Sequence, residues 1–161
     1  MLATAGPWSA LTSVEAYTPT GWITLPPLPH AASEATACVL NGRLYVMGGT
    51  NCDKLQVLEM SEENEFTWTV KADMPSVRCD AASAVVHGKL WLMGGLVEYF
   101  EDTATVTIYD PATDTWVEGP ELPQPGLYIH AGTLRYNGTA WVGAGGAPLH
   151  RGGACGSVLL G

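Results

Sequence analysis

The sequence lacks the marks of several large classes of protein. No apolar run approaches the roughly 18 residues that cross a membrane as a helix, and residues 1–16 lack the basic and apolar regions of a signal peptide. There is no phosphate-binding loop, dinucleotide fingerprint or nucleophile elbow, and no segment has a convincing helical period. We therefore predict a cytoplasmic protein with no membrane contact and no recognisable catalytic motif.

Charged residues are scarce, and their balance is acidic. They make up 14% of the chain, against 47% hydrophobic residues, and the formal net charge is −9. This composition predicts a folded protein. Because an acidic surface repels phosphate groups, we expect no nucleic-acid partner, whereas a basic protein partner remains compatible. The alternative is that the acidity serves solubility alone.

Metal-binding patterns are also missing. None of the four cysteines forms a C-x-x-C pair, and the four histidines are scattered along the chain. We therefore predict no catalytic residues, no metal site and no cofactor. The cysteines and histidines in question are Cys38, Cys52, Cys79, Cys155, His30, His87, His130 and His150.

A short apolar run that ends in a glycine pair recurs along the chain. It appears as Leu44–Gly49 and Leu90–Gly95, and in degenerate form as Ala140–Gly146. The glycine pairs are 46 and 51 residues apart. A period near 50 residues with a four-stranded unit is typical of the blades of a β-propeller.

Each of these runs is preceded by a strand of small residues and a tight turn. The predicted turns are Asn41–Gly42, His87–Gly88 and Asn137–Gly138, at which both positions tolerate positive φ. The blades of a propeller converge on an axis, so small side chains suit the innermost strand. The predicted innermost strands are Thr36–Leu40, Ala81–Val86 and His130–Leu134.

A third and a fourth strand are predicted after each glycine pair. The third strands are Lys54–Met60 and Ala104–Tyr109, and residues 153–161 resemble another third strand without its fourth. The fourth strands contain Trp68 and Trp116, each seven residues before a proline. We expect each tryptophan to cover the face of a neighbouring blade. The same pattern predicts a hairpin near the N-terminus, with strands Ser13–Tyr17 and Trp22–Leu25.

Together, the Gly-Gly strand, the Tyr-Asp-Pro turn, the tryptophan and the following Leu-Pro or Met-Pro resemble the kelch repeat. The resemblance implies an all-β, kelch-type β-propeller that is incomplete, with about three four-stranded blades. Residues 1–11 are then a weakly patterned lead-in. The repeats that follow are a half blade at 12–29, blades at 30–75 and 76–123, and a degenerate partial blade at 124–161.

The chain departs from the kelch pattern in three ways. Met60 is assigned to the place of a tyrosine, and the arginine that usually follows the proline occurs only as Arg78. The number of blades falls below the four to eight of closed propellers, which would leave exposed edges. We therefore expect a fragment of a longer protein, or self-association that completes the propeller.

The alternation of strand direction predicts one face on which loops from several blades meet. Kelch adaptors of ubiquitin ligases bind partner peptides on this face, so the resemblance implies a protein-interaction module, of which the substrate-recognition part of such an adaptor is one form. The candidate partner-binding residues are Arg78, Asp80, Tyr99, Phe100 and Tyr128. Aromatic residues between carboxylates would suit a basic peptide. The structural alternative is that Tyr99 and Phe100 pack on the blade while Arg78 pairs with Asp80 or with a backbone carbonyl.

Two other functional hypotheses remain open. Enzymes that resemble kelch propellers include sialic-acid epimerases and galactose oxidase, so the chain could be a fragment or relative of a sugar enzyme. Polar groups near the axis are limited to Glu34, Arg78 and Asp80, and the histidines do not form a copper-type set. The third hypothesis is a fragment with no function of its own.

Overall fold

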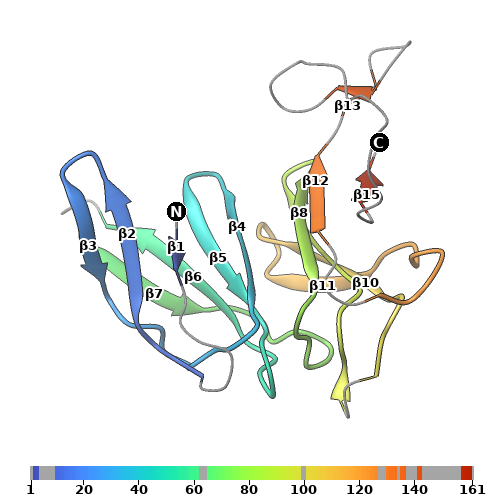
Figure 1. The fold of residues 1–161 in the computed structure, drawn as a ribbon, viewed down its shortest axis with the longest axis horizontal. Helices are drawn as coiled ribbons and strands as arrows, with labels where there is room; N and C mark the ends of the chain where they lie inside the picture. Colours follow the sequence, from blue (N-terminus) through green and yellow to red (C-terminus); the bar gives the residue numbers. More distant parts are fainter. Residues whose placement is uncertain are drawn as a thin grey trace.

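The computed structural model describes the side chains of residues 10–61, 65–98 and 101–126, and the backbone of several short strands outside these ranges. Those strands are β1 (Leu2–Ala3), β12 (His130–Thr133), β13 (Arg135–Tyr136), β14 (Trp141–Val142) and β15 (Ser157–Leu160). The fold is all-β and forms consecutive sheets, as predicted (Figure 1).

Among the described residues, no helix is long and apolar enough to span a membrane.

Two four-stranded antiparallel sheets form the centre of the structure. The second sheet runs in the order β4-β5-β6-β7, and the third sheet runs β8-β9-β10-β11. Their strands are β4 (Thr36–Leu40), β5 (Arg43–Met47), β6 (Leu55–Met60), β7 (Phe66–Val70), β8 (Ala82–Val86), β9 (Lys89–Met93), β10 (Val106–Asp110) and β11 (Thr115–Glu118). The turns Asn41–Gly42 and His87–Gly88 have positive φ throughout, which confirms the predicted hairpins.

The first sheet contains β1, β2 (Val14–Thr18) and β3 (Gly21–Leu25) in that order. The β2–β3 hairpin is the predicted one, and Tyr17 lies opposite Trp22. In the third sheet Tyr109 lies opposite Trp116 in the same way. The hairpin β2–β3 is therefore the outer half of a blade, and β1 pairs with β2 where a second strand belongs.

The strand register corrects one prediction. Trp68 lies opposite Leu58, not Met60, so Leu58 takes the place that Tyr109 and Tyr17 take in the other sheets. Leu58 is buried, whereas Met60 is 61% exposed at the end of β6. The connection between β6 and β7 is longer than the turn before Trp116, so counting back from Trp68 along the sequence gives the wrong residue.

The glycine pairs allow neighbouring sheets to approach closely. Gly48 and Gly49 have φ of 66° and 120°, and a Cβ on Gly48 would collide with the carbonyl oxygen of Arg78. The N–H of Gly49 donates to that same oxygen at 2.8 Å. The N–H of Gly95 makes the equivalent bond, to the carbonyl of Gly126 at 2.7 Å. Each glycine pair thus joins its sheet to the chain segment that leads into the next one.

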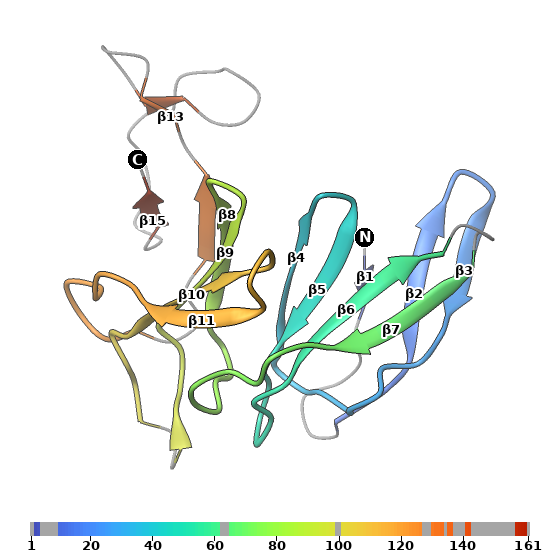
Figure 2. The same ribbon diagram turned by 180° about the vertical axis from the view of Figure 1, so that it is seen from behind.

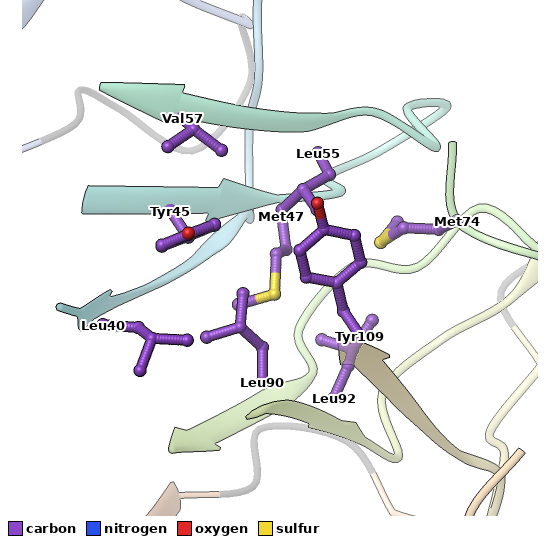
Figure 3. Packing of buried hydrophobic residues seen from close by; sticks show 9 residues of the cluster. All are labelled: Leu40, Tyr45, Met47, Leu55, Val57, Met74, Leu90, Leu92 and Tyr109. Carbon is purple, nitrogen blue, oxygen red and sulfur yellow. The ribbon is translucent and has the colours of Figure 1, made fainter. Parts of the chain in front are cut away.

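Apolar side chains fill the spaces between the sheets. Figure 3 shows the cluster between the second and third sheets, where the ring of Tyr109 lies beside Met47 and Leu55. A second cluster, which includes Val14, Val46 and Leu58, lies between the first and second sheets. Figure 2 shows the second sheet between the other two, so both of its faces are covered.

The tryptophans on the outer strands of the second and third sheets pack toward the preceding sheet. Trp68 belongs to the cluster shared with the first sheet and donates its indole N–H to the carbonyl of Pro26 at 2.7 Å. Trp116 packs on the cluster shared with the second sheet and donates to the carbonyl of Ala72 at 2.9 Å. The expectation that tryptophans cover a neighbouring blade is confirmed, and the direction is the same in both.

Beyond the third sheet the strand pairing differs from that of a regular blade. β12 is the predicted first strand and lies beside β8. β15, predicted as a third strand, instead pairs with β12 in parallel, while β13 pairs with β14. A third strand requires a second strand as its ladder partner. β14 has only two residues, whereas β12 offers a ladder of four.

Candidate functional site

Loops from the second and third sheets gather at one edge of the structure. This loop edge consists of residues 30–35, 48–54, 76–81 and 94–105, which lead into the innermost strands or follow the glycine pairs. The lower edge in Figure 1 contains these loops, and the one between β9 and β10 extends furthest beyond the strands. The arrangement follows from the antiparallel order, because a first strand begins where the second strand ends.

Arg78 lies under the loop edge rather than on it. Its side chain is only 3% exposed. The Nη1 group donates to the carbonyl oxygens of Gly94 (3.0 Å) and Thr105 (3.1 Å), and Nη2 donates to the hydroxyl of Ser76. Burial lowers the pKa of the guanidinium, although a group of such high pKa keeps its charge. Arg78 therefore ties the two ends of the 94–105 loop together.

From the sequence, Arg78 could pair either with a backbone carbonyl or with Asp80. The structure shows the pairing with backbone carbonyls and not the pairing with Asp80. Among the described residues, no carboxylate forms an ion pair with Arg78. Its Nε atom is buried and has no hydrogen-bond partner there. The role of Arg78 at this edge is thus to position a loop.

Asp80 lies at the surface of the loop edge, beside Glu34. The N–H of Asp80 donates to the carbonyl oxygen of Glu34 at 3.0 Å, and the hydroxyl of Thr50 donates to the carboxylate of Glu34 at 2.7 Å. Both acidic residues have positive φ, 58° for Glu34 and 51° for Asp80. They occupy equivalent positions, five residues after Pro29 and Pro75. That matched spacing is the sequence signal that could have found this pair.

The surroundings of Asp80 disfavour its negative charge. Partial burial raises the pKa of the Asp80 carboxyl, and the nearby charge of Glu34 raises it further. Burial also raises the pKa of the Cys79 thiol. The donor atoms of Glu34, Cys79 and Asp80 lie within 4.8 Å of one another, a spacing compatible with a metal ion. Exposed acidic groups often approach one another in this way without a metal, so the spacing alone defines no metal centre.

The loop between β9 and β10 is anchored at its base. Leu96 exchanges two backbone hydrogen bonds with Cys79 (2.8 and 3.1 Å), and the N–H of Val97 donates to the carbonyl of Glu101 at 3.0 Å. Thr103 donates its N–H to Gly95. The described residues that flank the tip of the loop, Glu98 and Glu101, are both exposed. Tyr99 and Phe100 of this tip lie outside the described residues, as does the side chain of Tyr128.

The accessible charge on the loop edge is acidic. Glu98, Glu101 and Asp102 are exposed on the β9–β10 loop, and Glu34 is exposed in the loop before β4 of the neighbouring sheet. The positive charge of Lys54 is matched by two carboxylates, those of Asp53 and Asp73. Because Arg78 is buried, the described part of this edge offers no unpaired basic group to an acidic ligand.

The described histidines do not form a metal-binding set. His30 lies in the loop before β4, where its backbone N–H and carbonyl bond the buried side chain of Gln56. His87 is exposed in the β8–β9 turn, at the opposite edge of its sheet. The side chains of His130 and His150 lie outside the described residues.

Comparison with known proteins agrees with this geometry. Residues 78–123 match the Kelch motif. The chain is also 31% identical to Kelch-like protein 35 of Mus musculus in an alignment of 122 residues that covers 71% of this chain. The chain is therefore a member of the kelch-repeat family and carries the blades of a kelch-type β-propeller, an incomplete one with about three blades.

Solved structures with the same fold include YjhT and a fungal oxidase. The chain resembles the structure of YjhT with a TM-score of 0.58 and 25% identity over 64% of this chain. It resembles a fungal alcohol oxidase of the AA5 family in complex with copper with a TM-score of 0.51 and 25% identity over 68% of this chain. The chain spans 20% of the length of the mouse relative, and 31% and 24% of these two solved chains.

Proposed function

We propose that this chain is a protein-interaction module that binds a protein partner through its loop edge. The observation that carries the proposal is the β9–β10 loop, whose base is fixed by Arg78 and by Cys79 while its residues Glu98, Glu101 and Asp102 are exposed. Loops held on a rigid scaffold are favourable positions for recognition. Similarity to a kelch-like protein supports the same class of function.

The partner that fits this edge is a basic segment of a protein. The exposed carboxylates of Glu98, Glu101 and Asp102 would attract lysine and arginine side chains and speed their association. In this proposal Tyr99, Phe100 and Tyr128 are the aromatic anchors, and Asp80 belongs to the acidic rim. Arg78 acts by holding the loop and does not touch the partner.

A charge-reversal experiment tests this proposal. We would measure the binding of fluorescent lysine- and arginine-rich peptides to the chain by anisotropy, with Glu98→Lys/Glu101→Lys as the test variant. The matched control is Glu65→Lys/Glu118→Lys, which changes the net charge equally at exposed positions, one just before β7 and one at the end of β11. We expect saturable binding that the test variant loses and the control keeps. Equal binding by both variants would show that only net charge matters and would refute the loop-edge site.

The proposal extends to the larger assembly. As part of a kelch protein, the chain would serve as the substrate-recognition portion of a ubiquitin-ligase adaptor in the cytoplasm, and it would self-associate to complete its propeller. Affinity capture with the chain as bait, followed by the same capture with Glu98→Lys/Glu101→Lys, tests the adaptor role. Recovery of ligase subunits or ligase substrates only with the unmodified chain is the expected result.

A sugar enzyme is the second candidate function. The fungal oxidase among the structural neighbours supports it, as does the polar group formed by Glu34, Cys79 and Asp80 at the loop edge. Assays of sugar oxidation and mutarotation would decide between the two candidates. Turnover that Asp80→Asn abolishes would favour the enzyme, whereas no turnover with any sugar would favour the interaction module.

A further inference from the structure

Gln56 is a fully buried polar residue that bonds to the loop edge. Its side chain, on β6 of the second sheet, is 0% exposed. The amide oxygen accepts the backbone N–H of His30 at 2.8 Å, and the amide nitrogen donates to the carbonyl oxygen of the same residue at 3.0 Å. A buried amide is costly unless its polar groups are bonded, and here one residue bonds both of them. Gln56 therefore fixes the point at which segment 30–35 of the loop edge begins.

The contact with Gln56 links this segment to a strand rather than to another loop. Ala32 exchanges two backbone hydrogen bonds with Leu11 (3.0 and 3.1 Å), and the carbonyl of Ser33 accepts one from Thr50 (2.9 Å). Leu11 and Thr50 both lie outside the strands of the second sheet. The hydrogen bonds of Gln56, in contrast, join the segment directly to β6.

The third sheet has Thr107 at the position of Gln56. Gln56 lies opposite Val46 on β5, and Thr107 lies opposite Leu92 on β9. Val46 and Leu92 each precede the first glycine of their glycine pair by two residues, so the two registers match. Thr107 is buried, and its hydroxyl has no hydrogen-bond partner among the described residues. Thr107 therefore does not link its strand to the segment that leads into the third sheet.

Arg78 provides the corresponding link from the opposite side. It takes the place of Ala32, three residues after the proline, in the segment that leads into the third sheet. Its Nη1 group donates to the carbonyl of Thr105, the residue before β10, at 3.1 Å. Both links thus join the segment before a first strand to the start of the third strand of the same sheet. The long polar side chain extends from the strand in the second sheet and from the segment in the third.

We propose that Gln56 positions segment 30–35 of the loop edge, in the role that Arg78 has in the third sheet, and that the two links are interchangeable. The residue that this positioning serves is Glu34, whose carbonyl accepts the N–H of Asp80 at 3.0 Å and whose carboxylate belongs to the acidic edge. The functional part of the inference rests on the binding of a basic segment proposed above. The structural part does not, because amide exchange requires no ligand.

Hydrogen exchange of single amides, followed by NMR, tests the positioning role. Gln56→Met keeps an unbranched side chain of similar length but removes both hydrogen bonds to the segment. We expect the amides of Ala32 and Asp80, which are bonded within and to this segment, to exchange about tenfold faster. The amide of Leu96, in the loop between β9 and β10, should keep its rate because Arg78 still holds that loop.

The matched control is Thr107→Val, which keeps the shape of the side chain at the equivalent position. It removes a buried hydroxyl without breaking a hydrogen bond, so the amides of Ala32 and Asp80 should keep their rates. The proposal is overturned if Gln56→Met accelerates only the core amides of β5 and β9. In that case Gln56 stabilises the fold as a whole and positions no loop.

A transplant tests whether the two links are interchangeable. Arg78→Ala is expected to speed exchange of the Cys79 amide, which donates to the β9–β10 loop at 3.1 Å. Adding Thr107→Gln supplies the side chain that the second sheet has at this position, so we expect the double variant to recover protection of the Cys79 amide. If Arg78→Ala alone does not fold, recovery of folding by the double variant is the same result. No recovery of either kind would refute the interchange.

Peptide binding separates this inference from the proposed function. In the anisotropy assay with lysine- and arginine-rich peptides, Gln56→Met should bind more weakly than the unmodified chain, whereas Thr107→Val should bind equally well. If the unmodified chain binds no peptide, the loop-edge function is refuted, and the exchange rates still decide the role of Gln56. Faster exchange with unchanged affinity would confirm that Gln56 holds the segment and refute Glu34 as a contact of the partner.

Discussion

Trp116 donates its indole N–H to the carbonyl oxygen of Ala72, 2.9 Å away, across the boundary between the third and second sheets. The N–H of Ala72 in turn donates to the carboxylate of Asp114 at 2.9 Å. Both backbone polar groups of Ala72 are thus bonded by the third sheet. Because Asp114 also accepts the hydroxyl hydrogen of Tyr109, these contacts form one network that joins two blades.

Replacing Trp116 by phenylalanine tests the hydrogen bond at this boundary. Trp116→Phe keeps an aromatic ring but removes the indole donor, so we expect the free energy of unfolding to fall by about 1 kcal/mol. Urea unfolding followed by circular dichroism measures the change. Val117→Thr, on the exposed side of the same strand, serves as the control and should change the value by less than about 0.5 kcal/mol.

The network also predicts a pH dependence. The N–H of Ala72 and the hydroxyl of Tyr109 hold the pKa of Asp114 below its usual value. A carboxyl whose pKa is lower in the folded state stabilises the fold above its unfolded pKa of about 3.9 and loses that contribution as pH falls through the folded pKa.

We therefore expect Asp114→Asn to be less stable than the unmodified chain at pH 7, with the difference shrinking below about pH 4. Thermal unfolding across this pH range measures it. A difference that stays constant down to pH 2 would show that the charge of Asp114 makes no contribution.

The glycine pairs predict a strong contrast between two substitutions. Gly48→Ala places a Cβ against the carbonyl oxygen of Arg78 at a φ of 66°. Gly42→Ala has nearly the same backbone strain, with φ 75°, but has open space around it. We expect Gly42→Ala to cost about 1–2 kcal/mol, and Gly48→Ala to cost clearly more. Equal losses in a denaturant titration would mean that the close approach of the sheets is unimportant.

Arg78 gives a prediction about stability rather than affinity. Arg78→Met keeps most of the apolar stem but leaves the carbonyls of Gly94 and Thr105 without their donor. We expect a loss of about 2–3 kcal/mol in the free energy of unfolding, since buried acceptors would lose charged partners. Ser76→Ala, which removes only the hydroxyl that accepts from Nη2, should cost much less. Amide exchange in residues 94–105 should increase in Arg78→Met.

The sequence predicts the strands well because their limits are set by local signals. Asn41–Gly42 and His87–Gly88 determine their hairpins through residues that accept positive φ. The sequence does not predict Leu58 opposite Trp68, because the β6–β7 hairpin has one more paired position and a slightly longer turn than the β10–β11 hairpin, and spacing alone does not show either. Likewise, Arg78 is recognisable as an unusual residue, but its carbonyl partners lie at the two ends of a loop and become neighbours only after folding.

The candidate site was predictable to a similar extent. The gathering of loops at one edge follows from antiparallel strand order, and the structure brings Asp80 there with Glu34. The Arg78 side chain points inward because its acceptors, the carbonyls of Gly94 and Thr105, lie under the loops. That position becomes known only once the loops have been placed. The exposure of Tyr17 and Trp22 depends on which blades are present, so the repeat pattern alone gives them the same role as Tyr109 and Trp116.

The most direct test of the loop-edge proposal is to map peptide binding by NMR. Amide shifts of the ¹⁵N-labelled chain would be followed during titration with a lysine- and arginine-rich peptide. The account predicts saturable shifts at residues 34, 50–53, 79–80 and 96–102, and none at the turns 41–42 and 87–88 on the opposite edge. Shifts that are confined to the opposite edge, or spread evenly over the surface, would contradict it.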